Sequence, residues 1–170
     1  MNCKNNMDNI FYLETERLII RTFNENDVKD AYEYLSDKNV MEYIEPIMTY
    51  ESVVSFIKKA GIKNKLIFAI ILKNNGKLIG HLIFHEYKNK NVYELGWIIN
   101  KNYWNNGYAK EAGKEIIKYG FDILKLEKII GETEEENIKS IALFEKLGMK
   151  LVSKNEDGLI EYEIINKLEE

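Results

Sequence analysis

The stretch VYELGWIINKNYWNNGYAKEA, residues 92–112, decides the fold because its hydrophobic period changes from two to about 3.6. Alternation over 92–99 predicts a strand, and apolar residues at steps of three and four predict a helix over 107–124. A short strand follows over 128–133. Together these segments predict a βαβ unit, whose strands must be parallel and whose crossover should be right-handed. The apolar row on one face of the first strand is Tyr93, Leu95, Trp97 and Ile99.

The rest of the chain adds strands and helices around this unit. Asn24 and Thr49 are typical helix N-caps, and Gly61 is placed to end the second helix. The order β-α-α-β-β-β-α-β-α-β-β predicts an α/β fold, a mixed sheet flanked by helices. The further strands are expected over 17–23, 66–72, 78–84, 150–154 and 158–165, and the further helices over 24–37, 49–61 and 137–148.

The composition is that of an ordinary globular protein with one core. The 170 residues, 45% hydrophobic and 31% charged, exclude a disordered chain and suit a single domain, which we place at 13–168 after a polar tail at 1–12. No apolar run is long enough to cross a bilayer, and the polar start is unlike a signal peptide, so we expect a cytoplasmic protein without a membrane partner.

The charges and the few special side chains exclude other classes. The net charge is −4 and only Arg17 and Arg21 are arginines, so no basic stripe predicts nucleic-acid binding. Cys3 lies in the polar tail, which disfavours a catalytic thiol. His81 and His85 lie about 13 Å apart along one strand face, too far to share a metal ion. We therefore expect no metal.

Gly107 stands where the helix after the first strand begins. Helix starts leave N–H groups unpaired and carry a partial positive charge, and a glycine there lets a phosphate approach the backbone. The alternative is that Asn105 or Asn106 caps the helix and Gly107 fills a turn. A second helix start, NIKSIALFEKLGM, places Asn137, Ser140 and Phe144 on one side. Neither the Rossmann fingerprint nor a P-loop is present, which argues against NAD and ATP.

Three ordered motifs resemble the GNAT superfamily of acyl-CoA-dependent N-acetyltransferases, in particular its RimJ/RimL-like branch. LETERLIIRTFNENDVKDAYEYL is similar to the opening strand and helix, WNNGYAKEA to the acyl-CoA loop, and NIKSIALFEKLGM to the segment that follows. The resemblance extends from about residue 13 to residue 165.

Membership would imply a V-shaped split between the strands at 92–99 and 128–133, with the pantetheine arm of acetyl-CoA in the gap. Backbone groups of Trp97 and Ile99 would pair with the arm, and the amides from Asn105 to Ala109 would hold the pyrophosphate. The implied acetyl-CoA-binding residues are Trp97, Ile99, Trp104, Asn105, Asn106, Gly107, Tyr108, Ala109, Asn137, Ser140 and Phe144.

The sequence departs from the family pattern at a few positions. Lys101 replaces a common proline, Asn105 replaces a glycine, and Trp104 stands where other branches have Gln or Arg. More important, Phe144 replaces the tyrosine that can protonate the departing thiolate. Ser140 is then the candidate acid, although a small residue there can also serve helix packing.

Glu94 is the candidate base that takes a proton from the acceptor amine, because it borders the split and faces away from the apolar row. A solvated or ion-paired Glu94 and a base at Glu161 or water remain the alternatives. The loop NVMEYIEPIMTY would contact the acceptor through Glu42, Tyr43 and Glu45, or would only be a solvated loop.

The expected function is acetyl transfer from acetyl-CoA to a primary amine, either a small molecule or a protein N-terminus, by direct attack in a ternary complex. The alternative is a non-catalytic acyl-CoA-binding or sensing domain, which the absence of a hydroxyl at Phe144 favours. The oligomeric state is not readable from the sequence, and a homodimer is compatible with it.

Overall fold

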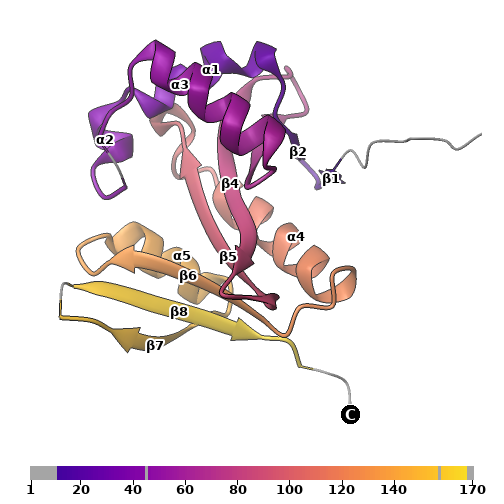
Figure 1. The fold of residues 1–170 in the computed structure, drawn as a ribbon, viewed down its shortest axis with the longest axis vertical. Coiled ribbons are helices and arrows are strands. Elements are labelled where there is room, and N and C mark those ends of the chain that lie inside the picture. The colour runs from indigo at the N-terminus through magenta and orange to yellow at the C-terminus, as the bar shows by residue number, and fades with distance from the viewer. Residues whose placement is uncertain (1–10, 45, 157, 168–170) are drawn as a thin grey trace, which may run out of the picture.

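The computed structural model describes residues 11–44, 46–156 and 158–167. One mixed sheet in the order β1-β2-β3-β4-β5-β6-β8-β7 runs through the molecule (Figure 1). Its strands are β1 (Tyr12–Glu14), β2 (Leu18–Thr22), β3 (Ile67–Leu72), β4 (Leu78–Tyr87), β5 (Asn89–Ile99), β6 (Lys128–Glu134), β7 (Lys150–Lys154) and β8 (Leu159–Ile165). The helices are α1 (Val28–Leu35), α2 (Lys38–Met41), α3 (Tyr50–Phe56), α4 (Tyr108–Asp122) and α5 (Ile138–Lys146). Short helical turns are η1 (Glu25–Asp27), η2 (Ile57–Lys63) and η3 (Lys101–Tyr103).

The mixed α/β architecture and its central βαβ unit are confirmed. Helix α4 connects β5 and β6, which pair in parallel. Asn24 and Thr49 accept hydrogen bonds from backbone amides at the starts of η1 and α3. The described part of the chain contains no helix long and apolar enough to span a bilayer.

Three local predictions were wrong. The expected order lacked β1 and α2, both too short to leave a periodic pattern. Phe11 and Tyr12, which we assigned to the tail, belong to the fold, because Phe11 packs on Phe68 at 4.2 Å and Tyr12 begins β1. Gly61 does not end a helix but lies within the π-helical turns of η2. A Cβ atom there would come within 2.9 Å of Phe23, so this glycine serves close packing.

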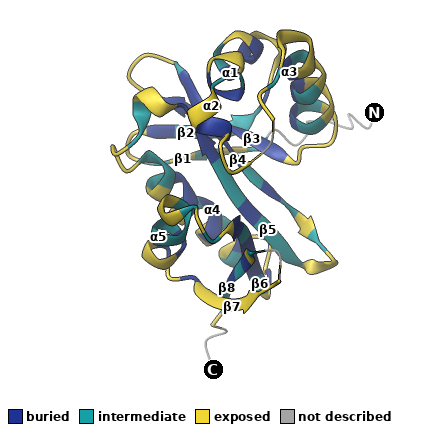
Figure 2. Cartoon of the chain, turned by 90° about the vertical axis from the view of Figure 1, so that its left-hand side faces the viewer, coloured by how far each residue is buried: buried dark blue, intermediate teal, exposed yellow. Residues whose placement is uncertain are grey.

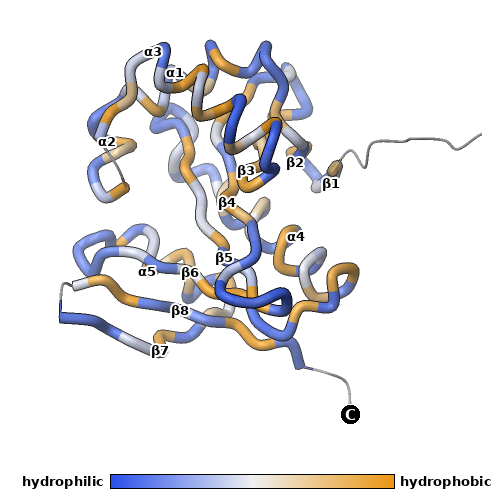
Figure 3. Tube along the Cα trace, viewed as in Figure 1, coloured by the Kyte–Doolittle hydropathy of each residue, from blue (hydrophilic) through white to orange (hydrophobic). Residues whose placement is uncertain are grey.

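Two apolar clusters, one on each face, cover the sheet. Figure 2 marks the buried residues and Figure 3 the hydrophobic ones along the chain. Helices α4 and α5 pack on one face, and α1, α2, α3 and η2 pack on the other. Strand β3 is buried along its whole length because both faces are covered there. Leu95 and Ile99 belong to the α4–α5 layer and Ile98 to the opposite layer, as the period of two predicts.

The two parallel strands separate soon after they meet. Pairing of β5 with β6 covers only the three pairs from Val92–Lys128 to Glu94–Ile130. Beyond Glu94, β5 continues to Ile99 beside β4 alone, while β6 continues beside β8. The ring of Phe144 packs at the point of separation, because a Cβ atom on Gly131 would lie 2.2 Å from it. The sheet is therefore split where the resemblance implied.

Candidate active site

A cleft of about 1090 Å³ opens beside this split. It is bordered by the C-terminal end of β5, the segment that leads into α4, and the start of α5, with the loop after α2 on the far side. Nine of the expected site residues line it: Trp97, Ile99, Trp104, Asn105, Gly107, Tyr108, Ala109, Asn137 and Ser140. Three others, Glu94, Asn106 and Phe144, are not part of its lining.

The start of α4 offers unpaired backbone donors. Gly107 is the N-cap, with φ +80°, and no side chain caps the helix. Within the described chain, the amides of residues 105–110 have no hydrogen-bond partner. The space at Gly107 is open, since the nearest atom to an added Cβ would be Arg17 Nη2 at 3.6 Å. Open N–H groups at a helix start fit a phosphate group.

Asn105 and Asn106 have other roles than capping. Asn105 adopts φ +62°, a conformation that asparagine tolerates better than most residues. The Asn106 side-chain amide donates to the carbonyl oxygens of Tyr103 and Trp104, at 3.2 and 2.9 Å. The alternative of an asparagine cap is therefore wrong, and Asn106 shapes the loop from outside the cleft.

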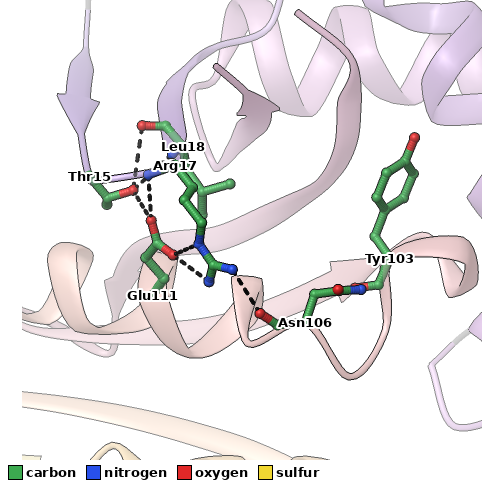
Figure 4. A network of polar contacts seen from close by, with 6 residues as sticks. All are labelled: Thr15, Arg17, Leu18, Tyr103, Asn106 and Glu111. Atoms are coloured by element: carbon green, nitrogen blue, oxygen red, sulfur yellow. Dashed lines mark hydrogen bonds and ion pairs between the residues drawn. The ribbon is translucent and has the colours of Figure 1, made fainter. Parts of the chain in front are cut away.

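A polar network holds this loop against Thr15 and Arg17, in the N-terminal segment that precedes β2 (Figure 4). The Glu111 carboxylate accepts hydrogen bonds from the Thr15 hydroxyl at 2.5 Å and from the backbone amide and Nε of Arg17 at 2.8 and 2.7 Å. Arg17 Nη1 in turn donates to the Asn106 carbonyl at 3.1 Å. We refer to Thr15, Arg17, Asn106 and Glu111 as the loop network. Sequence reasoning missed it, since its partners lie more than 85 positions apart and no local pattern marks them.

The edge of β5 that faces the split carries backbone polar groups. The Asn100 amide donates to Ile79 of the β4 side, and successive residues point their backbone groups to opposite edges. Those of Ile99 and Trp97 therefore point toward the split. The Ile99 carbonyl accepts a hydrogen bond from the Trp104 indole at 2.8 Å. The expected pairing with an extended ligand is thus open at Trp97, whereas one Ile99 acceptor position is occupied by the protein.

The start of α5 adds polar groups to the opposite wall. Asn137 accepts a hydrogen bond from the Ser140 amide at 3.2 Å and so caps the helix. The Ser140 hydroxyl remains available at the cleft wall. Phe144 does not line the cleft but is buried, with its ring 4.8 Å from that of Trp97 and 5.2 Å from that of Tyr162.

Lysines on the cleft wall form a further group that sequence reasoning missed. Lys139 Nζ lies 4.0 Å from the centre of the Trp104 ring, and Lys110 and Lys146 also line the cleft. Such cations fit the phosphates of a nucleotide-bearing ligand. The sequence did not reveal this group, because the lysines are scattered among acidic residues and form no basic run.

Glu94 lies where the pairing of β5 with β6 ends, on the sheet face opposite α4 and α5. Its carboxylate is 3.6 Å from Nε2 of His85. Burial raises the pKa of Glu94, the His85 side chain lowers it, and the nearby Glu132 raises it again. Such a carboxyl group is better suited to accept a proton than a fully solvated one. Glu161 lies one strand further away, opposite Glu132.

The loop after α2 reaches both the cleft and a second, smaller pocket. Glu42 and Tyr43 line both, and the second pocket also includes Glu134. Glu45 lies outside the described residues. Among residues 11–44, 46–156 and 158–167, no three His, Cys, Asp or Glu side chains are arranged to hold a metal ion.

Comparisons with known proteins agree with this geometry. The family model described as "Acetyltransferase (GNAT) domain" matches residues 17–150. The chain is 42% identical over 140 residues to the uncharacterized N-acetyltransferase YnaD of Bacillus subtilis, covering 82% of each chain. A GNAT-family acetyltransferase structure from Bacillus anthracis superposes with a TM-score of 0.86 at 35% identity, covering 93% of this chain and 100% of that one. The spermidine N-acetyltransferase of Vibrio cholerae, solved with CoA and spermine, shares the fold with a TM-score of 0.76 at 21% identity, covering 89% and 97%.

Proposed function

Since the chain belongs to the GNAT family of N-acetyltransferases, we propose that it transfers the acetyl group of acetyl-CoA to a primary amine by direct attack in a ternary complex. The observation that carries this proposal is the set of unpaired amides at the start of α4, which faces a cleft large enough for the cosubstrate. The residues present fit acetyl-CoA, because the cleft combines these donors, an open position at Gly107 and four lysines, of which Lys101 is paired with Asp37.

In this mechanism the amides of residues 105–109 bind the pyrophosphate, and the split edge of β5 orients the pantetheine arm at Trp97. Acetyl-CoA supplies an activated acyl group as a thioester. Glu94 removes a proton from the acceptor ammonium group, directly or through water, because only the neutral amine is a nucleophile. Ser140 supplies a proton to the leaving sulfur, in place of the hydroxyl that Phe144 lacks.

We propose a cationic acceptor, a small-molecule amine or a protein N-terminal α-amine, as in the RimJ/RimL-like branch. The acidic side chains Glu42, Glu94 and Glu132 support a cation on the side of the sheet opposite α4 and α5. One structural relative was solved with the polyamine spermine, which supports including polyamines among the candidates.

The experiment is an assay of free thiol and acetylated product with acetyl-CoA and a panel of amines, namely spermidine, aminoglycosides and peptides with free N-termini. Turnover with at least one amine, reduced by a factor of about 100 in Glu94→Gln, is the expected result. No turnover with any amine, together with tight binding of CoA, would favour the acyl-CoA-binding alternative that Phe144 suggests. No binding of CoA would overturn the proposal.

A further inference from the structure

His85 faces Glu94 across the β4–β5 pair and has no role in the mechanism above. The two residues are register partners, and both side chains are about one-quarter exposed, 27% for His85 and 26% for Glu94. This position lies at the point where β5 and β6 separate, so the pair lies at the vertex of the split.

The hydrogen bond at His85 Nδ1, the ring nitrogen that does not face Glu94, fixes the tautomer of the neutral ring. His85 Nδ1 lies 3.0 Å from the carbonyl oxygen of Glu86, and a carbonyl oxygen only accepts hydrogen bonds, so Nδ1 carries the hydrogen. In the neutral ring Nε2 then bears a lone pair. That lone pair faces Glu94 Oε2 at 3.6 Å, which brings two acceptors together with no proton between them.

A single added proton would satisfy both acceptors. On Nε2 it makes an imidazolium beside a carboxylate, and on Oε2 it makes a carboxylic acid beside an imidazole. The other charged groups near the pair lie mainly on β6 and β8. Glu132 acts on Glu94 from β6, Glu161 lies beyond it on β8, and Lys88 at the β4–β5 turn interacts with both of these glutamates.

We propose that His85 and Glu94 act as one proton acceptor, in which His85 positions Glu94 and receives the proton that Glu94 takes from the acceptor amine. This inference rests on the proposed function and adds a residue to it. The ammonium group loses one proton to the pair, which passes it to water. The neutral amine forms the C–N bond as the C–S bond breaks, Ser140 protonates the thiolate, and the second proton of the amine restores the Ser140 hydroxyl, so one proton is released per turnover.

His85→Gln tests the proposal, because glutamine can donate a hydrogen bond to Glu94 but cannot hold the proton. We expect kcat to fall by a factor of about ten or more, with the affinity for CoA unchanged and the acid limb of the pH profile of kcat/KM altered. Lys90→Gln is the matched control, since it removes one positive charge from an exposed position on the same hairpin. In the Glu94→Gln background, His85→Gln should cause no further loss.

A purely structural His85 would give equal losses in both backgrounds and an unchanged pH profile, which would overturn the inference while amine acetylation itself persisted. A second readout does not require turnover. Nitrogen-15 NMR should show hydrogen on Nδ1 of His85, with His81 as the other histidine signal, and carbon-13 NMR should show the Glu94 pKa rising in His85→Val, which removes the group that lowers it. A neutral His85 ring with its hydrogen on Nε2 and none on Nδ1, or an unchanged Glu94 titration, would contradict the proposal.

Discussion

The Arg17 guanidinium and the Glu111 carboxylate form a two-point contact, with Nε at 2.7 Å and Nη2 at 2.6 Å from the same oxygen, Oε2. Arg17 precedes β2, and Glu111 lies in the first turn of α4, so the contact joins segments 94 positions apart. Because Arg17 also donates to the Asn106 carbonyl, the pair holds the loop whose amides face the cleft. The proposed anion site is thus held in place by residues outside it.

Replacing Glu111 with glutamine should weaken cosubstrate binding without unfolding the protein. The amide cannot accept all the donors that Thr15 and Arg17 direct at the carboxylate, so the loop loses order before binding. We expect the Kd for CoA to rise by about tenfold, which corresponds to about 1.4 kcal/mol. Isothermal titration calorimetry measures the change, and Glu115→Gln, one turn further along α4, is the control. Equal affinities in the two variants would contradict the role of the loop network.

Gly107→Val should abolish detectable binding of CoA while the protein remains folded. A β-branched residue at φ +80° is strained, and its side chain would occupy the open space above the free amides. Gly76→Val is the matched control, because Gly76 also has positive φ, +70°, and open space around it, but lies in the β3–β4 turn. Both variants should lose similar stability on thermal denaturation, and only Gly107→Val should lose CoA affinity. Retained affinity would refute the assignment of the loop.

Ser140→Ala should lower kcat and leave the KM for acetyl-CoA nearly unchanged, if its hydroxyl supplies the proton to the thiolate. The loss should be about tenfold or more, a typical size for a general acid. The helix should stay stable, because Asn137 bonds the Ser140 backbone amide and not its hydroxyl. Asn137→Ala is the contrasting variant, because it removes the cap of α5 and should lower the free energy of unfolding by about 1 kcal/mol. Unchanged kcat in Ser140→Ala would show that solvent, and not Ser140, protonates the thiolate.

His81 should make stability depend on pH. It is fully buried, its Nδ1 lies 2.8 Å from the Tyr34 hydroxyl, and burial lowers its pKa from 6.5 to about 3. At pH values above 6.5 the residue is neutral in both states. Between pH 6.5 and pH 3 the unfolded chain binds a proton that the folded protein does not. For this group alone, the free energy of unfolding therefore falls by about 1.4 kcal/mol for each unit by which the pH decreases. Urea denaturation of the wild type and His81→Leu at several pH values measures this, and parallel pH dependences would contradict it.

The sequence predicted much of the architecture. The change of period at residues 92–112 predicted β5 and α4, since side-chain alternation and helical recurrence are local consequences of burial on one face. Gly107 was singled out as the start of a helix, and the structure places it there as the N-cap of α4, because a glycine between poor caps is itself a local signal. Gly61 was misread, since the reason for that glycine is the ring of Phe23, distant in the chain.

The sequence by itself determined the order of the main elements, the family and the loop that begins α4, because each depends on neighbours within a few positions. Only the tertiary structure decided that Phe144 is buried at the split and not exposed in the cleft, and that Arg17 meets Glu111 and His85 meets Glu94. The physical reason is that chain closure brings these groups together across the sheet, and burial, charge pairing and strand register act through space, where sequence spacing carries no signal.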